Sequence, residues 1–322
     1  MKVLVTGVAG FIGMHCARRL LARGDEVVGV DSVTPYYSVE LKRARLAEIG
    51  SAKNFSFEQA DLADAGATLR IFQSAGAEAV LHLAAQPGVR HSLENPGSYV
   101  QANLVGFANL LEGCRAHPPR HLVFASSSSV YGNSGKLPWS EADNVDRPIS
   151  LYAATKKSNE LMAHVYSHLF SIPVTGLRFF TVYGPWGRPD MSPMLFARAI
   201  MDGKPIQVFN RGEMQRDFTY VDDVVEGTLR ALDRPPAGQP PYRIFNIGNH
   251  SPVPLLDYIA ALERALGRKA VLDMKPMQPG DVAATYADTR ALADATGFAP
   301  STPLETGLAR FAEWFKHYYG YA

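Results

Sequence analysis

Cysteine is scarce in this sequence, whose 322 residues include only Cys16 and Cys114. The two lie far apart in segments that we expect to be helical. This argues against a disulfide framework or a cysteine-based metal site and is typical of a reducing cytoplasm. An excess of charge is also missing, because 32 Lys and Arg against 31 Asp and Glu leave a net charge of +1. The sequence therefore carries no electrostatic signature of a protein that binds nucleic acid or an anionic membrane.

Long hydrophobic runs, internal repeats and metal-ligand clusters are missing as well. The apolar residues 1–6 are followed at once by glycine, so this stretch is too short for a signal peptide or a membrane span and fits a first buried strand. His82 falls on a predicted strand, and His164 and His168 fall on a predicted helix, without a carboxylate at the spacing of a metal site. We therefore expect neither a metal nor a membrane segment.

What the first half does contain is a regular alternation of short apolar runs and helical segments. The apolar runs cover residues 2–6, 26–30, 55–58, 79–82, 121–125 and 174–178, and the helical segments cover 11–23, 38–49, 64–75, 98–116 and 152–170. Continuous apolar strands that alternate with helices predict a parallel sheet covered on both faces. We expect an α/β fold with a doubly wound sheet of Rossmann type.

Beyond about residue 180, prolines and glycines interrupt the chain. Residues 216–232 look like the end of a strand followed by a helix, and residues 242–247 look like a further strand. We expect the chain to return to the larger domain there. The prediction is a Rossmann domain of residues 1–180 plus 217–248, with a smaller discontinuous α/β lobe of residues 181–216 plus 249–322.

A glycine-rich turn joins the first predicted strand to the first helix. Gly7, Gly10 and Gly13 would allow a tight turn, a close approach of the backbone to a pyrophosphate, and close packing of helix on strand. The amides at the helix start, including those of Phe11 and Ile12, would then face the phosphate charge. The turn predicts a dinucleotide site.

Two acidic positions extend this predicted site. Asp31 ends the second predicted strand, where a carboxylate binds ribose hydroxyls and repels a 2′-phosphate, which favours NAD over NADP. Asp61 and Leu62 follow the third strand, where the adenine ring would lie. For both acids a cap or turn role stays open as an alternative.

Four serines, Ser126 to Ser129, end the strand at 121–125, and Tyr152 and Lys156 follow on the next predicted helix. The spacing of four residues places the phenol and the ammonium one turn apart on one helix face. A neighbouring cation favours the phenolate, so the pair is suited to acid/base catalysis near neutral pH.

With these motifs the sequence resembles the extended short-chain dehydrogenase/reductase family over essentially its whole length. The resemblance implies a Ser–Tyr–Lys catalytic site at Ser127, Tyr152 and Lys156. It also implies that Ser126, Tyr152 and Lys156 contact the cofactor, that Asn103 supports it, and that Leu83, Ala84, Ala85 and Gln86 line the wall beside its phosphates.

Within this family the sequence is most similar to the UDP-glucuronate 4-epimerases. The similarity is carried by residues 85–96, 178–191 and 216–223, and by the stretch from Asp31 to Tyr37 that leads into a basic helix. It implies NAD-dependent epimerisation of UDP-glucuronate at C4 through a 4-keto sugar, in a homodimer. The residues expected to contact the nucleotide sugar are Pro87, Arg90, Ser127, Ser128, Ser129, Thr181, Arg188, Asn210, Arg216 and Asp281.

Positions at which this sequence differs from related enzymes narrow the expected activity. UDP-galactose 4-epimerases usually carry Asn in place of Thr181 and an arginine near Gln278, which leaves Arg216 as the candidate for the diphosphate. The 4,6-dehydratases need an Asp-Glu pair where this chain has Ser128 and Ser129. The alternatives that stay open are a UDP-glucuronate decarboxylase, a UDP-glucose 4-epimerase and a non-catalytic NAD-binding regulator.

Overall fold

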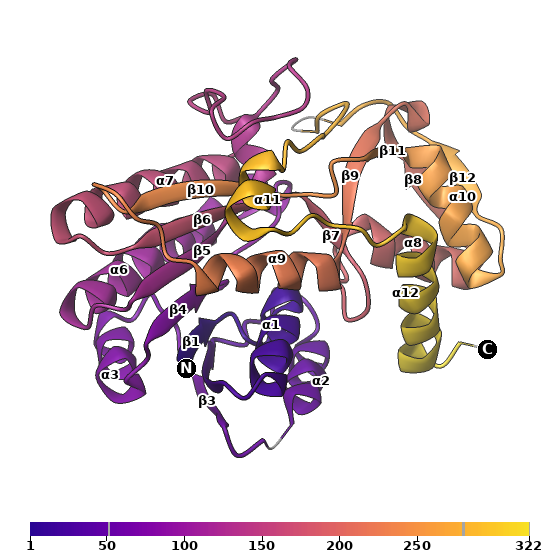
Figure 1. The fold of residues 1–322 in the computed structure, drawn as a ribbon. Coiled ribbons are helices and arrows are strands. Elements are labelled where there is room, and N and C mark those ends of the chain that lie inside the picture. Colours follow the sequence, from indigo (N-terminus) through magenta and orange to yellow (C-terminus); the bar gives the residue numbers. More distant parts are fainter. Residues whose placement is uncertain (51, 279–280, 322) are drawn as a thin grey trace.

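A seven-stranded parallel sheet forms the centre of the computed structural model, which describes residues 1–50, 52–278 and 281–321. Its order is β10-β6-β5-β4-β1-β2-β3 (Figure 1). The strands are β1 (Lys2–Thr6), β2 (Glu26–Asp31), β3 (Phe55–Gln59), β4 (Ala79–His82), β5 (His121–Ser127), β6 (Val174–Phe179) and β10 (Tyr242–Ile247). This order confirms the predicted doubly wound fold. The strands are added in one direction from β1 to β3 and in the other from β4 to β10, and such sheets bind ligands at this switch point between β1 and β4.

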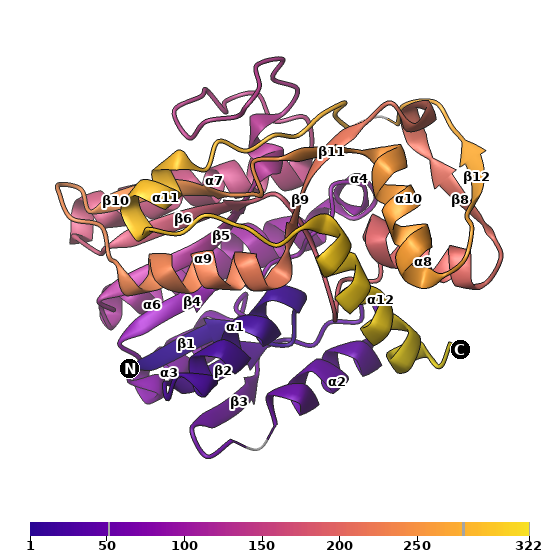
Figure 2. The ribbon, with the colours of Figure 1, turned by 45° about the vertical axis from the view of Figure 1, so that its right-hand side comes forward.

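Helices cover both faces of the sheet. One face carries α1 (Phe11–Ala22), α2 (Val39–Ile49) and α9 (Val221–Asp233), and the other carries α3 (Ala65–Ala75), α6 (Gly106–Ala116) and α7 (Leu151–Phe170) (Figures 1 and 2). The core is divided in the same way. Val3 and Val5 of β1 belong to one buried cluster and Leu4 to another, because alternate side chains of a strand point to opposite faces.

The segment expected as one helix over residues 98–116 is divided. It begins with α5 (Pro96–Tyr99), continues as the π-helix η1 (Val100–Val105) and ends as α6. η1 has only six residues, which is too short for its wider turn to show as a change of period in the sequence. π-Helical turns are frequent at functional sites, and Asn103 lies within this one.

The second half adds two small sheets and three helices at one end of the large sheet, and a fourth helix, α11, that packs against α9 and β10 (Figure 2). β7 (Thr181–Tyr183), β9 (Gln215–Tyr220) and β11 (Pro252–Pro254) form one sheet, and β8 (Pro205–Val208) pairs with β12 (Val271–Met274) in the other. The helices are α8 (Ser192–Met201), α10 (Leu255–Leu266), α11 (Arg290–Thr296) and α12 (Leu304–Tyr319). Among the helices described here, none has the length and apolar character needed to cross a bilayer.

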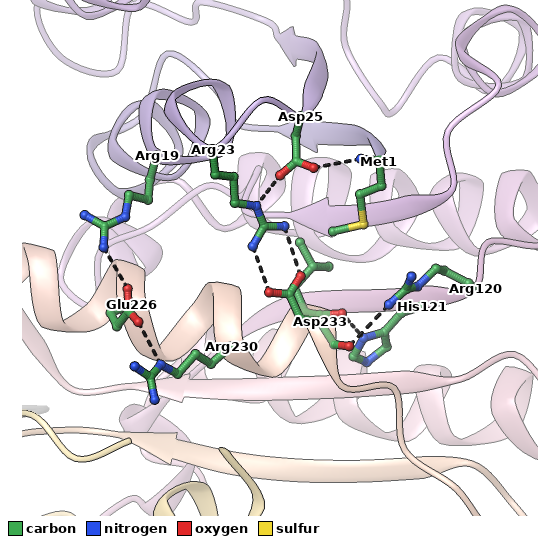
Figure 3. Close-up of polar contacts among 10 residues, drawn as sticks. Met1, Arg19, Arg23, Asp25, Arg120, His121, Glu226, Arg230 and Asp233 are labelled. Carbon is green, nitrogen blue, oxygen red and sulfur yellow. Dashed lines mark hydrogen bonds and ion pairs between the residues drawn. The ribbon is translucent and has the colours of Figure 1, made fainter. Parts of the chain in front are cut away.

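Ion pairs join α9 to α1 (Figure 3). The Arg23 guanidinium donates to both carboxylate oxygens of Asp233, at 2.7 and 2.9 Å. Glu226 accepts from Arg19 at 3.0 Å and from Arg230 at 2.7 Å. These groups are partly exposed, so each pair contributes at most about 1 kcal/mol. Together they set the position of the helix that follows β9 against the helix that follows the glycine turn.

Candidate active site

The glycine turn between β1 and α1 is as tight as its sequence predicts. Gly7 has a φ of +73°, and a Cβ there would lie 2.6 Å from the backbone nitrogen of Ala84. A Cβ on Gly13 would lie 2.1 Å from the carbonyl oxygen of Gly7. Gly10 precedes the helix and offers no capping side chain, and the first turn of α1 contains no acidic residue. The helix start therefore presents backbone amides and a positive potential to the cavity, as a pyrophosphate requires.

Asp31 holds this turn from the end of β2. Its carboxylate accepts from the backbone amides of Ala9 at 3.1 Å and of Val33 at 2.8 Å. Burial raises the pKa of Asp31, while these two hydrogen bonds and the Lys42 ammonium oppose the rise. Because a carboxylate can accept about four hydrogen bonds, acceptor positions remain for two ribose hydroxyls.

The wall after β4 is fixed by Asn103. The Asn103 side chain accepts from the Gln86 backbone amide at 2.8 Å and donates to the Gln86 carbonyl at 3.0 Å. It also donates to the Thr155 hydroxyl on α7 at 3.0 Å. Asn103 is buried and does not line the cavity, so it acts through the backbone of Gln86, whose neighbours Leu83, Ala84 and Ala85 do line it.

Asp61 and Leu62 do not line the cavity in this structure. The Asp61 carboxylate is exposed and accepts from the backbone amide of Ala63 at 2.9 Å. The alternative role as helix cap belongs instead to Asp64, which accepts from the amide of Ala67 at 2.9 Å. Two acids within four residues of each other can both cap a helix, and the spacing in the sequence does not decide between them.

The predicted Ser–Tyr–Lys group meets at the carboxyl end of β5. Tyr152 lies in the first turn of α7, which begins where the Ser150 hydroxyl accepts from the amide of Ala153 at 3.1 Å. Lys156 follows one turn later and donates to the carbonyl of Ala125 at 2.9 Å. All three predicted catalytic residues, Ser127 included, line one cavity.

The electrostatics of this group are set by burial. Burial lowers the pKa of Lys156 to about 8 and raises the pKa of Tyr152. Two neighbours work against the rise at Tyr152, the Ser127 hydroxyl through a hydrogen bond and the Arg188 guanidinium through its charge. A further positive charge against the phenol would lower its pKa again.

A buried ion pair lies next to the Ser127–Tyr152–Lys156 group, between β6 and α7. Arg178 of β6 donates to both carboxylate oxygens of Glu160 on α7, at 2.8 Å each. Glu160 also accepts from the Ser126 hydroxyl at 2.6 Å, and Arg178 donates to the Tyr131 phenol at 2.9 Å. The hydroxyl of Ser126 is therefore bound to this ion pair, although Ser126 also lines the cavity.

Polar groups continue along the cavity away from the glycine turn. The Ser129 hydroxyl donates to the Ser127 hydroxyl at 2.9 Å, and Ser128 and Thr181 line the wall. Arg188 lines it too, with its Nε and Nη2 facing the Asp190 carboxylate.

Asp190 also accepts from the Tyr36 phenol at 3.0 Å. Desolvation lowers the pKa of Arg188, but its pairing with Asp190 outweighs this, and the net effect raises the pKa. Arg188 therefore stays a cation at any physiological pH.

The remaining predicted contacts lie toward the second lobe. Arg216 donates to the carbonyls of Gln215 at 2.9 Å and Ala283 at 3.2 Å, and it lines the cavity together with Asp281 and Pro87. Arg90 is outside the lining and pairs with Asp281 at 3.1 Å.

Asn210 is likewise outside the lining, with a φ of +50° and its side chain donating to the carbonyl of Glu213 at 2.8 Å. The structure thus brings together all predicted site residues except Asp61, Leu62, Arg90, Asn103 and Asn210.

The cavity measures about 420 Å³ and runs from the glycine turn past Tyr152 to Arg216. Sequence reasoning missed several lining residues, among them Ser32, Thr34, Tyr36, Tyr37, Lys42, Trp139, Phe179 and Phe180. The first four belong to the stretch from Asp31 to Tyr37 that carries the resemblance, and Lys42 lies on the helix α2 that follows it, but no motif assigned any of the five a role. Trp139, Phe179 and Phe180 are apolar, so the sequence suggests core residues at these positions and not residues of a binding site.

Comparisons with known proteins agree with this geometry. A model described as the NAD dependent epimerase/dehydratase family matches residues 3–248. The chain is 48% identical to a probable UDP-glucuronate 4-epimerase of Rhizobium meliloti (strain 1021), covering 99% of this chain and 98% of the relative. It is 48% identical to UDP-glucuronate 4-epimerase 3 of Arabidopsis thaliana, covering 99% of this chain and 77% of that protein.

Among solved structures, the fold matches the UDP-glucuronic acid 4-epimerase from Bacillus cereus in complex with UDP-glucuronic acid and NAD. The TM-score is 0.92 at 34% identity, over 99% of this chain and 100% of that one. A UDP-glucose 4-epimerase from Thermotoga maritima matches with a TM-score of 0.89 at 30% identity, over 99% of this chain and 100% of that one. The family match over most of the chain and the full-length relatives identify the chain as a member of the NAD dependent epimerase/dehydratase family.

Proposed function

We propose that the protein catalyses the NAD-dependent epimerisation of UDP-glucuronate to UDP-galacturonate at C4 of the sugar. The observation that carries the proposal is one cavity that joins three features: an amide-lined glycine turn, the Ser127–Tyr152–Lys156 group and the Arg188 guanidinium. The first two suit hydride chemistry, and the third suits a carboxylate. Relatives named as UDP-glucuronate 4-epimerases at 48% identity support the same substrate.

The residues around the glycine turn fit NAD. The uncapped amides of α1 suit the pyrophosphate, and the Asp31 carboxylate suits the two hydroxyls of the adenosine ribose and repels a 2′-phosphate. When bound, NAD supplies an acceptor that takes the C4 hydride and gives it back. The overall reaction has no net redox change, so the cofactor is expected to stay bound between turnovers.

The residues beside C4 of the sugar transfer the proton of its 4-hydroxyl group. Tyr152, as the phenolate, accepts the proton of the sugar 4-hydroxyl and returns it after the sugar has turned. Lys156 favours the phenolate by its charge, and Ser127 holds the same sugar oxygen by a hydrogen bond. The Ser127 contact already lowers the pKa of Tyr152 in this structure.

The carboxylate of the substrate needs its own restraint. The 4-keto sugar is a β-keto acid, which loses CO2 when the bond to the carboxylate aligns with the carbonyl π system. Asp190 binds the Nε and Nη2 edge of Arg188 and so fixes the plane of the guanidinium, which leaves the Nη1 edge as the one we assign to the substrate carboxylate. Ser128, Ser129 and Thr181 provide further hydrogen bonds along the same wall. These groups favour epimerisation over decarboxylation.

NMR of the products formed from UDP-glucuronate without added NAD tests the proposal. UDP-galacturonate is the expected product, and its absence contradicts the proposed function. A UDP-pentose with CO2 identifies a decarboxylase, and comparable turnover of UDP-glucose identifies an epimerase of neutral sugars. A protein that keeps NAD but converts none of these is a binding protein.

The matched variant for this experiment is Tyr152→Phe, which removes the hydroxyl and little else. We expect kcat to fall about a thousandfold, because the proton acceptor is lost. The NAD that is released on denaturation should match that of the wild type. A Tyr152→Phe enzyme with wild-type turnover would remove Tyr152 from the mechanism.

We further propose a homodimer formed through α7 and the segment from η1 to α6. The support is an exposed apolar stripe on α7, where Leu161, Val165 and Leu169 are 56%, 48% and 63% exposed at a spacing of four residues. Such a stripe on a helix that already packs on the sheet is typical of a subunit interface.

The division into two lobes and the location of the protein are proposals as well. We propose a Rossmann domain of residues 1–180 plus 217–248 and a nucleotide-sugar lobe of 181–216 plus 249–322, supported by β10 in the large sheet and by β8 and β12 outside it. A cytoplasmic location is supported by the free, buried thiols of Cys16 and Cys114.

A further inference from the structure

Arg45 on α2 is a fully buried guanidinium whose N–H groups are all used. Its Nε donates to the carbonyl of Trp186 at 3.0 Å, and its Nη2 donates to the carbonyls of Trp186 at 2.7 Å and Gly187 at 3.0 Å. Its Nη1 donates to the carbonyl of Ala9 at 3.2 Å and to the Tyr37 phenol at 2.7 Å. These five bonds account for all five donors of an arginine. Within the described chain, the five bonds end on four acceptors, the carbonyls of Ala9, Trp186 and Gly187 and the Tyr37 phenol, and none of these is a carboxylate.

The five bonds connect three segments that border the cavity. Ala9 belongs to the glycine turn, Tyr37 to the stretch after β2, and Trp186 and Gly187 to the loop that follows β7. The Trp186 backbone has a φ of +65°, a conformation that a bulky residue adopts only when its surroundings impose it. Arg45 binds the carbonyl of this same residue twice.

The loop held by Arg45 leads directly into Arg188. The preceding carbonyl, that of Pro185, is also bound, by the His15 ring of α1 at 3.0 Å. Three successive carbonyls of this loop are therefore tied to side chains of α1 and α2, the helices that follow β1 and β2. Beyond them the Arg188 fork is set by Asp190, which accepts from Tyr36 of the stretch after β2.

We propose that Arg45 is a positioning residue that sets the backbone of the loop 185–187 and so places Arg188 against the substrate carboxylate. The inference rests on the proposed function and deepens it: Arg45 touches neither the sugar nor the reacting atoms, yet it determines whether the carboxylate is held away from the alignment that releases CO2. A neutral side chain cannot supply the five bonds, and lysine, with three donors on a single atom, cannot reproduce the planar fork.

The consequence of a displaced Arg188 is a change of product. In the 4-keto sugar the C5–C6 bond breaks and CO2 leaves. The electron pair of that bond moves onto the 4-keto oxygen as an enolate, which takes a proton at C5. Return of the hydride to C4 then gives a UDP-pentose. The ratio of UDP-pentose to UDP-galacturonate therefore reports how well the carboxylate is held.

The experiment compares Arg45→Met and Arg45→Lys with Arg43→Met, a control on the same helix whose side chain is exposed. Each protein is supplied with excess NAD, because loss of the Ala9 contact also loosens the glycine turn. We expect the Arg45 variants to raise the KM for UDP-glucuronate about tenfold or more and to increase the fraction of UDP-pentose, with Arg45→Lys intermediate. Arg43→Met should match the wild type.

A second, milder variant keeps the test valid if Arg45→Met does not fold. Tyr37→Phe removes one acceptor of Arg45 and leaves its carbonyl contacts, so a smaller shift of the product ratio in the same direction is expected. Folded Arg45→Lys and Tyr37→Phe enzymes with the wild-type KM and product ratio would overturn the inference. A uniform loss of kcat at an unchanged product ratio would do so too, because it indicates a merely structural role.

The wild-type reaction separates this inference from the proposed function. If the wild type forms no UDP-galacturonate, the proposed function fails, whatever the variants do. The inference is then judged by calorimetric binding of UDP-glucuronate and UDP-glucose. Positioning of Arg188 by Arg45 predicts that Arg45→Lys weakens binding of the sugar with the carboxylate and not of the neutral sugar, and equal changes for both sugars overturn it.

Discussion

The proximity of the Tyr152 and Lys156 side chains could be predicted from the sequence, because helical backbone geometry alone determines it. A spacing of four residues on a helix places two side chains together, and both residues line the cavity. The partner of Arg188 could not be predicted, because the order Arg-Pro-Asp does not say whether the two side chains turn toward each other. Arg45 was missed for a related reason, since its partners lie on loops whose paths depend on the whole fold.

The pH dependence of catalysis is expected to depend on Lys156. Its pKa is lowered to about 8 by burial, so its ammonium is charged below that pH. In the proposed mechanism this charge favours the phenolate of Tyr152. Lys156→Met removes this charge and should raise the pKa of Tyr152, which moves the acid limb of the kcat/KM profile to higher pH. Initial rates across the pH range, with NAD content as a check on folding, measure the shift. An acid limb that stays in place would show that another cation controls the phenol.

Secondary-structure elements of the first half were predicted closely because each strand is a continuous apolar run bounded by turn residues. β7, β8, β11 and β12 were not predicted, since each has only three or four residues and lacks a period that distinguishes it from a loop. The π-helical turn at η1 also escaped, although it carries Asn103. Short or irregular elements owe their conformation to the packing around them more than to their own residues.

The joint between β1 and α1 gives a prediction for an element boundary. Gly13→Ala would place a Cβ 2.1 Å from the carbonyl oxygen of Gly7, which must push the helix away from the strand and distort the turn. We expect a loss of about 1–3 kcal/mol in the free energy of unfolding and loss of copurified NAD. Gly97→Ala is the control, because a Cβ there meets no atom within 4 Å. Thermal denaturation and NAD content distinguish the two variants, and equal behaviour would contradict the packing role of Gly13.

For the molecule as a whole, the alternation of strands and helices in the sequence predicts the fold but does not predict the oligomeric state. The doubly wound sheet could be predicted because right-handed crossovers leave few topologies for such a pattern, whereas the order of its seven strands comes from the structure. Assembly depends on which apolar residues remain exposed after folding, and the sequence does not show this before the packing of α7 is known.

The proposed homodimer predicts the effect of a charge on α7. Val165→Arg places a cation in the middle of the exposed apolar stripe and should convert a dimer into a monomer in light scattering after size-exclusion chromatography. Val271→Arg, at a residue of β12 that is 54% exposed, is the control and should leave the mass unchanged. A wild-type protein that is monomeric at micromolar concentration would contradict the dimer.

β10 is an edge strand of the large sheet, and this position has consequences for folding during synthesis and for the design of chimeras. β10 pairs in parallel with the fully buried β6, so β6 has no partner on that side until the ribosome has released residues 242–247. An unpaired apolar edge is where nascent chains aggregate. A fragment that ends near residue 180 should therefore precipitate during expression, and a chimera that exchanges residues 181–241 for those of a relative must retain β10 to remain dispersed.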